Sequence, residues 1–178
     1  MSTSAKIKLI EEIKRELFSD DDIVVMKAVH KCREEGSKPL VEPLIAVYAS
    51  SKHAEIRREI ADLLSNLKVS GLEEIFTKAI NNKEYKAVRK DLLAFIWNSG
   101  IQPVEAVVTL AEIAVEGSFE EALECATIIE SIEDPITETD VLEASSVLRN
   151  ALSSDSTSSK KDLWYDMLTS LESKTEEF

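Results

Sequence analysis

Glycine and proline are scarce in this 178-residue chain, which has only four of each. That is too few for the many turns of a β-sandwich or barrel. The four glycines fall between segments whose apolar residues recur with helical spacing: Gly36, Gly71, Gly100 and Gly117. Because 44% of the residues are hydrophobic, the chain has the means to bury a core, and we predict a single all-α domain over residues 1–178.

Long hydrophobic runs and cysteines are also lacking. No run of about eighteen apolar residues occurs, so we predict no transmembrane helix. The first residues, MSTSAKIKLIEEIKREL, mix acids into their apolar pattern and do not resemble a signal peptide. The two cysteines, Cys32 and Cys125, cannot form a disulfide framework, and both fall on or near apolar faces. We therefore expect a cytoplasmic protein in which both thiols are core residues.

Sequence signatures of catalysis are absent. The chain has no G-x-S-x-G, phosphate loop or dinucleotide fingerprint. His53-Ala54-Glu55 matches the H-x-E half of a zinc deaminase signature, but the P-C-x-x-C half is missing, so an ordinary helix start is the favoured interpretation. We predict a non-enzymatic protein without catalytic residues, metal or cofactor. Acid–base catalysis stays open, because any two of the 34 carboxylates could converge.

Negative charge is concentrated in the second part of the chain. Residues 1–100 hold 17 Lys and Arg against 16 Asp and Glu, whereas residues 101–178 hold 4 against 18. Nearly all of the formal charge of −13 therefore comes from residues 101–178.

Helix starts are predicted where an N-cap side chain is followed three residues later by an acid or glutamine. These pairs are Ser19/Asp22, Ser70/Glu73, Asn81/Glu84, Ser99/Gln102, Ser118/Glu121, Thr137/Asp140 and Ser159/Asp162. With the apolar periodicity between them, they predict ten helices. The expected ranges are 4–18, 21–35, 38–50, 53–68, 71–81, 83–98, 102–116, 118–132, 138–153 and 159–173.

The helices repeat as pairs. Val25, Ile56, Val88 and Ala122 align with successive offsets of 31, 32 and 34 residues, and a second apolar position follows four residues later in each copy. One helical pair cannot bury both of its faces, so consecutive pairs are expected to stack into a continuous core.

The stretch PLIAVYASSKHAEIRREIADLLSNL, from Pro43 to Leu67, resembles a HEAT repeat of the compact bacterial type. Ile56-Arg57 and Val88-Arg89 match the V-R pair of the second helix. The acid that usually precedes that helix is replaced by Ser50-Ser51 in one unit and by Asn81-Asn82 in another. The resemblance implies a right-handed α–α superhelix of five antiparallel pairs, with units at about 4–36, 37–69, 70–100 and 101–134 and a divergent cap pair at 135–178.

In such stacks the second helices line a concave binding face. The resemblance places one aromatic and five basic side chains there: Lys27, Lys31, Arg58, Lys86, Lys90 and Trp97. Structural or solvent-facing roles compete with binding for each of them. A second candidate surface, for docking a basic partner, is acidic and consists of Glu120, Glu121 and Glu124, for which solubility is the competing interpretation.

The resemblance favours a protein-binding scaffold or adaptor whose partner is another, possibly basic, protein. The alternative is a DNA-binding or DNA-repair protein similar to alkyl-base glycosylases, and bilin lyases are further relatives of the family. Nucleic acid is disfavoured as a partner because the acidic residues 101–178 would repel phosphates. The oligomeric state is not predicted.

Overall fold

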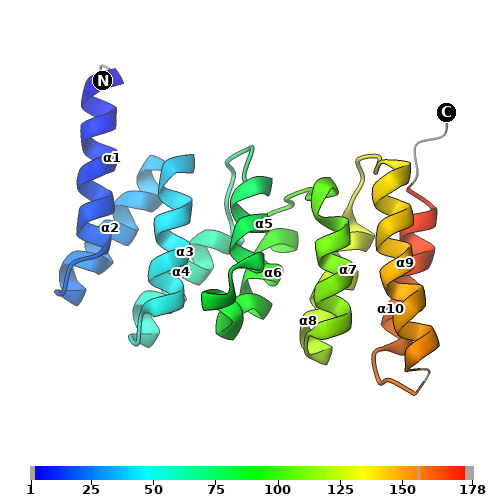
Figure 1. Ribbon diagram of the computed structural model, residues 1–178. Coiled ribbons are helices and arrows are strands. Elements are labelled where there is room, and N and C mark those ends of the chain that lie inside the picture. The colour runs from blue at the N-terminus through cyan, green and yellow to red at the C-terminus, as the bar shows by residue number, and fades with distance from the viewer. Residues whose placement is uncertain (1–2, 156, 175–178) are drawn as a thin grey trace. The chain divides into compact units, whose positions relative to one another are not determined.

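The computed structural model describes residues 3–155 and 157–174. Residues 1, 2, 156 and 175–178, which include the end of the predicted cap pair, lie outside the described residues. The described part of the chain forms ten α-helices and three short 3-10 helices and contains no β-strand (Figure 1). The prediction of an all-α chain with ten helices is therefore confirmed. The chain divides into two compact units, Met1–Ile75 and Phe76–Phe178.

The first unit contains four complete helices in two layers. They are α1 (Thr3–Leu17), α2 (Asp22–Glu35), α3 (Val41–Ser50) and α4 (Ala54–Ser65). Helix α1 packs on α2 and α3 on α4, while α1 also contacts α3 and α2 contacts α4. Val25 and Ile56, which the repeat alignment equates, are 5% and 3% exposed. The aligned apolar positions of the second helices thus lie in the core of this unit.

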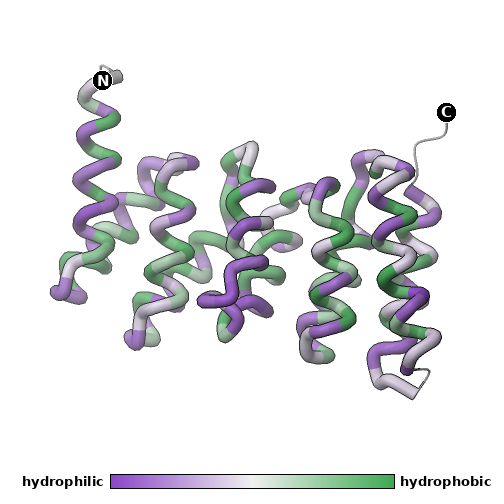
Figure 2. The backbone as a smooth tube through the Cα atoms, viewed as in Figure 1, coloured by the Kyte–Doolittle hydropathy of each residue, from purple (hydrophilic) through white to green (hydrophobic). Residues whose placement is uncertain are grey.

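The second unit continues the alternation of helices. Helix α5 (Glu73–Asn81) crosses the division between the units, and it is followed by α6 (Arg89–Asn98), α7 (Val107–Glu116), α8 (Phe119–Ser131), α9 (Glu138–Ser154) and α10 (Lys161–Glu172). Helix α8 lies between α6 and α10, and α7 packs on both α8 and α9. Hydrophobic and hydrophilic positions alternate around these helices (Figure 2), so each helix presents an apolar stripe to its neighbours.

Three predicted helices begin with a 3-10 turn rather than an α-turn. These turns are η1 (Lys38–Leu40), η2 (Lys83–Val88) and η3 (Val104–Ala106). Pro39 and Pro103 sit in or before two of them, where the missing N–H of proline costs no helical hydrogen bond. At η2 the capping residue is Asn82, whose side chain accepts a hydrogen bond from the Glu84 N–H, and not the predicted Asn81.

Some of the predicted helix caps are present in the structure and others are not. The Ser118/Glu121 capping box is present in full, and Thr137 accepts a hydrogen bond from the Asp140 N–H. The Ser19/Asp22 prediction is wrong, because Asp21 caps α2 by accepting from the Ile23 N–H. The Ser159/Asp162 prediction is also wrong: the N-cap of α10 is Lys160, and its side chain makes no capping hydrogen bond.

The last helical pair is tied to α7 and α8 through backbone carbonyls. The Trp164 indole N–H donates to the Ala114 carbonyl at 3.2 Å, and the Lys160 amine donates to the carbonyls of Val115 and Gly117. Lys174 donates in the same way to the carbonyls of Glu130 and Ile132. The final carbonyls of a helix have no partner within it, and a cation there also complements the helix dipole. Two lysines therefore close the ends of α7 and α8.

Candidate functional surfaces

Trp97 and Glu124, taken from the two predicted surfaces, are in direct contact. Trp97 lies in the last turn of α6 and is 40% exposed, and its indole N–H donates to a Glu124 carboxylate oxygen on α8 at 2.7 Å. The bond links a partly exposed aromatic ring on α6 to the neighbouring helix α8. One residue of each predicted surface thus meets the other at the contact between α6 and α8.

Glu121 serves the fold of this unit. It is 8% exposed, and its carboxylate accepts hydrogen bonds from the Arg89 Nε at 2.7 Å and the Ser118 backbone N–H at 2.8 Å. Burial alone would raise the pKa of Glu121, but these bonds outweigh it and lower the pKa below its usual value. The same contact raises the pKa of Arg89. Glu121 is therefore not accessible to a partner, and we do not include it in a docking surface.

Glu120, in contrast, is exposed at the start of α8. A hydrogen bond from its own backbone N–H lowers the pKa of Glu120, and the Ser118 hydroxyl and the charge of Lys90 act in the same direction. Lys86 and Lys90 are exposed as well. Glu120, Lys86 and Lys90 are therefore accessible. The charges of Glu120 and Lys90 lie close enough to reduce each other's electrostatic potential at this surface.

The basic candidates of the first unit have different surroundings. The Lys31 amine lies 2.7 Å from a Glu16 carboxylate oxygen of α1, and this hydrogen bond raises the pKa of Lys31. Lys31 therefore links α2 to α1. Lys27 and Arg58 are both exposed, so only these two of the three present free cationic groups to solvent.

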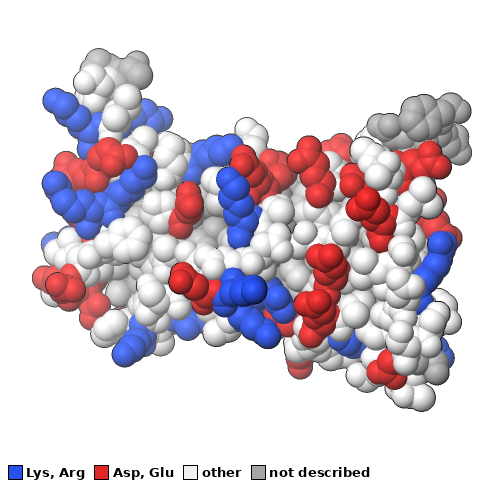
Figure 3. Space-filling view, in the orientation of Figure 1, with Lys and Arg blue, Asp and Glu red and all other residues white. Residues whose placement is uncertain are grey.

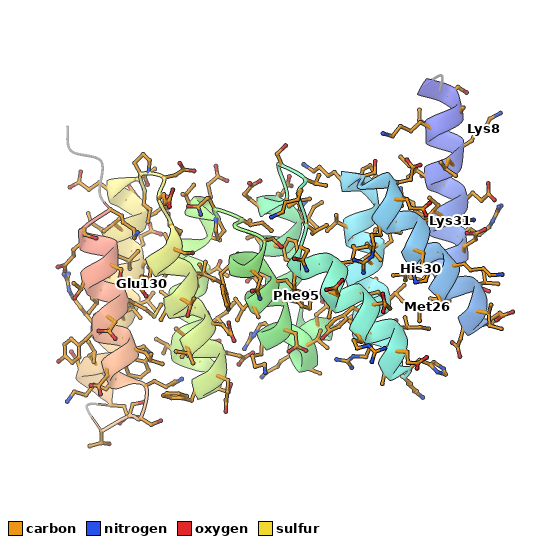
Figure 4. The ribbon with its side chains drawn as sticks, turned by 180° about the vertical axis from the view of Figure 1, so that it is seen from behind. Lys8, Met26, His30, Lys31, Phe95 and Glu130 are labelled. Atoms are coloured by element: carbon orange, nitrogen blue, oxygen red, sulfur yellow. The ribbon has the colours of Figure 1, made fainter. Side chains whose placement is uncertain are left out.

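A hollow of about 620 Å³ lies between α2 and the start of α4. Ile23, Met26 and Ile56 form its apolar part, and His30 and His53 contribute imidazoles. Met26 and His30 are labelled on α2 in Figure 4. Sequence reasoning missed this α2–α4 hollow, although the spacing of Ile23, Met26 and His30 marks a second stripe beside the core stripe of α2.

A second groove, missed as well, runs between α8 and α10. It has a volume of about 470 Å³, and each helix contributes one stripe of side chains. Helix α8 provides Leu123, Ala126, Thr127 and Glu130, and α10 provides Leu163, Asp166, Thr169 and Ser170. We call it the α8–α10 groove.

The two thiols of the chain are buried. Burial raises the pKa of the Cys32 thiol to about 12 and raises that of Cys125 further, so neither is a thiolate at neutral pH. Both cysteines are buried, as predicted. Within residues 3–155 and 157–174, no group of three or more His, Cys, Asp or Glu side chains is placed to hold a metal ion.

No helix among the described residues is both long enough and apolar enough to span a membrane. Comparison with protein-family models, with curated proteins and with solved structures found no match for this chain.

Proposed function

We propose that this chain is a HEAT-like scaffold that binds another protein through its row of second helices. The contacts within each unit support a solenoid, since first helices neighbour first helices and second helices neighbour second helices. In the proposed fold each pair is antiparallel and successive pairs stack in a right-handed superhelix.

One polar contact links successive repeat units in the manner expected of a HEAT-like protein. Arg89 occupies the arginine position of the V-R pair, and its partner Glu121 lies 32 residues further on, about one repeat length. The contact therefore joins equivalent helices of adjacent pairs. In this contact the acid comes from the first turn of the second helix and not from the loop before it.

The observation that carries the binding role is the apolar exposure along α6 and α8. Trp97 and Leu123 are 40% and 46% exposed. Glu124 holds the Trp97 indole on the side of α8 that faces α6, and Leu123 lines the groove on the side that faces α10, so exposed apolar groups flank α8 on both sides. Exposed aromatic and aliphatic groups within a polar surround are typical of protein interfaces.

The proposal is tested by site-specific photocrosslinking in the cells that make the protein. A photoreactive amino acid is placed at Lys90 or Glu120 on the second-helix face, and at Leu142 on α9 as a matched exposed control. We expect protein adducts at the first two positions and none at Leu142. Adducts to nucleic acid would favour the DNA-binding alternative, and equal labelling at all three positions would contradict a dedicated face.

A further inference from the structure

The α8–α10 groove has the dimensions of a site for one short helix. Its α8 stripe runs from Leu123 to Glu130 with spacings of three, one and three residues, so its members share one helical face. The α10 stripe from Leu163 to Ser170 has the same length. Each stripe extends about 10 Å along its helix, which corresponds to about two helical turns.

Small side chains line the floor of the groove. Ala126, Thr127, Thr169 and Ser170 are small, so the two helices leave a hollow between them. The Thr127 hydroxyl donates to the Leu123 carbonyl and the Thr169 hydroxyl to the Tyr165 carbonyl, each within its own helix. What these threonines offer to a ligand is therefore mainly their methyl groups, next to Leu123 and Leu163.

The rim of the groove is negative. Glu130, labelled between α8 and α10 in Figure 4, and Asp166 are both exposed, and neither carboxylate forms an ion pair with any residue of 3–155 or 157–174. The amine of Lys174 is engaged by the backbone carbonyls of Glu130 and Ile132. The groove therefore combines small and aliphatic side chains with two available carboxylates.

The remaining basic residues after residue 100 do little to offset this charge. Lys160 is bound to carbonyls at the end of α7, and Arg149 is paired with Glu172 at 2.7 Å. Only Lys161 of the four has no such contact in the described part of the chain. Acidic side chains also gather over α7 and the start of α9, on the face that Figure 3 displays.

We propose that the α8–α10 groove binds a short helical segment of a partner protein that carries lysine or arginine beside one large aliphatic residue. The aliphatic side chain packs on Leu123, Leu163 and the threonine methyl groups, and the cations face Glu130 and Asp166. Helices laid into grooves between two other helices are a common recognition mode, and charge complementarity selects a basic segment over an acidic one. This inference rests on the proposed scaffold function and specifies its ligand.

The test uses the full chain and three designed helical peptides of about 14 residues, long enough for about four turns. One peptide carries a leucine stripe flanked by lysines, the second replaces every lysine by glutamate, and the third replaces every leucine by serine. Binding is measured by fluorescence anisotropy at low and high salt. The protein variants are Leu123→Ala and the isosteric pair Glu130→Gln/Asp166→Asn. The charge-matched control pair is Glu112→Gln/Glu143→Gln, on the exposed faces of α7 and α9.

Only the leucine–lysine peptide is expected to bind, and high salt should weaken it. The Glu130/Asp166 pair should lower affinity about 5-fold and Leu123→Ala about 5- to 10-fold, while the control pair changes it less than about 2-fold. Binding of the glutamate peptide, or equal losses from the two charge pairs, would overturn the inference. If photocrosslinking finds a protein partner and no lysine peptide binds, the scaffold role stands and the proposed ligand is wrong.

Discussion

The two units of this chain use their charged side chains in different ways. Residues 1–75 carry 12 Lys and Arg against 14 Asp and Glu, whereas residues 76–178 carry 9 against 20. The first unit contains exposed ion pairs, such as Arg33 with Asp62 at 2.8 Å. The second unit also contains an exposed pair, Arg149 with Glu172, but its Arg89–Glu121 pair is more deeply placed, with side chains that are 15% and 10% exposed.

This difference helps to explain why the surface of the second unit carries an excess of negative charge. In the second unit, three cations bind groups of the fold: Arg89 binds a buried carboxylate, and Lys160 and Lys174 bind carbonyls at helix ends. The acids around them are left in excess at the surface. An acidic face is thus a consequence of how the unit is held together as well as of its composition.

The largest expected loss of stability comes from removing the cation of the buried ion pair in the second unit. Arg89→Met leaves the Glu121 carboxylate in a mostly buried position without its cation, which should cost about 3 kcal/mol of unfolding free energy. The matched change in the first unit, Arg33→Met, removes an exposed pair and should cost less than about 1 kcal/mol. Urea denaturation of both variants gives the two values. Equal losses would remove the distinction between the units.

A glycine of each unit, Gly117 in the second and Gly36 in the first, differs in the space that it leaves for a side chain. A Cβ at Gly117 would lie 2.5 Å from a Glu121 oxygen and 2.6 Å from the Ile113 carbonyl oxygen, so Gly117→Ala must displace backbone or the buried pair, at about 2–3 kcal/mol. Gly36, at the end of α2, has open space around that position and a φ of 53°. There Gly36→Ala should cost only the left-handed strain of about 1 kcal/mol. Thermal unfolding distinguishes them, and a larger loss at Gly36 would contradict this assignment.

A smaller effect is expected from the lysine that closes α7. Lys160→Met removes the donor to the Val115 and Gly117 carbonyls and the cation 5.5 Å from the Trp164 ring, and should cost about 1–2 kcal/mol. Burial lowers the pKa of Lys160, and this desolvation cost keeps the net loss modest. Lys31→Met in the first unit, where the amine pairs with Glu16 at a half-exposed position, is the control and should have a smaller effect in the same denaturation assay. A neutral Lys160→Met would show that water can replace the amine.

The smallest effect concerns pH. Because the folded-state pKa of Glu121 is lowered, its contribution to stability is present above its usual value of 4.5 and is lost as pH falls through the lowered pKa. The stability difference between the wild-type protein and Glu121→Gln should therefore shrink between neutral pH and about pH 3. Denaturation curves across this range test the sign. A difference that grows on acidification would contradict the ion pair with Arg89.

The helices were predictable because local chemistry decides them. Ser118 and Glu121 satisfy each other's orphan backbone groups within four residues, and the spacing alone identifies them. The cap of α2 was misassigned because Ser19 and Asp21 each accept a hydrogen bond from the N–H two residues later, and only the N–H that donates to Asp21, that of Ile23, belongs to the first turn of the helix. The apolar pattern specifies only which residues face inward, so it could not predict that three helices begin with a 3-10 turn.

The candidate surfaces were less predictable than the helices. Glu120, Glu121 and Glu124 look alike in sequence, yet Glu121 is buried against Arg89, Glu124 holds Trp97, and Glu120 is exposed. Adjacent helical positions differ by about 100° in direction, so one turn of α8 distributes three identical side chains over different environments. Neighbouring helices decide which of them remain available to a partner.

The sequence by itself determined that this protein is helical, where its ten helices lie, and that its negative charge follows residue 100. Apolar periodicity, helix caps and composition are properties of short stretches of sequence, so they can be recognised without knowing the fold. Only the tertiary structure decided that Arg89 and Glu121 pair across 32 residues, that lysines close the ends of α7 and α8, and that two stripes of small residues leave the α8–α10 groove. Each of these depends on which helix faces which, and no single stretch of sequence contains that information.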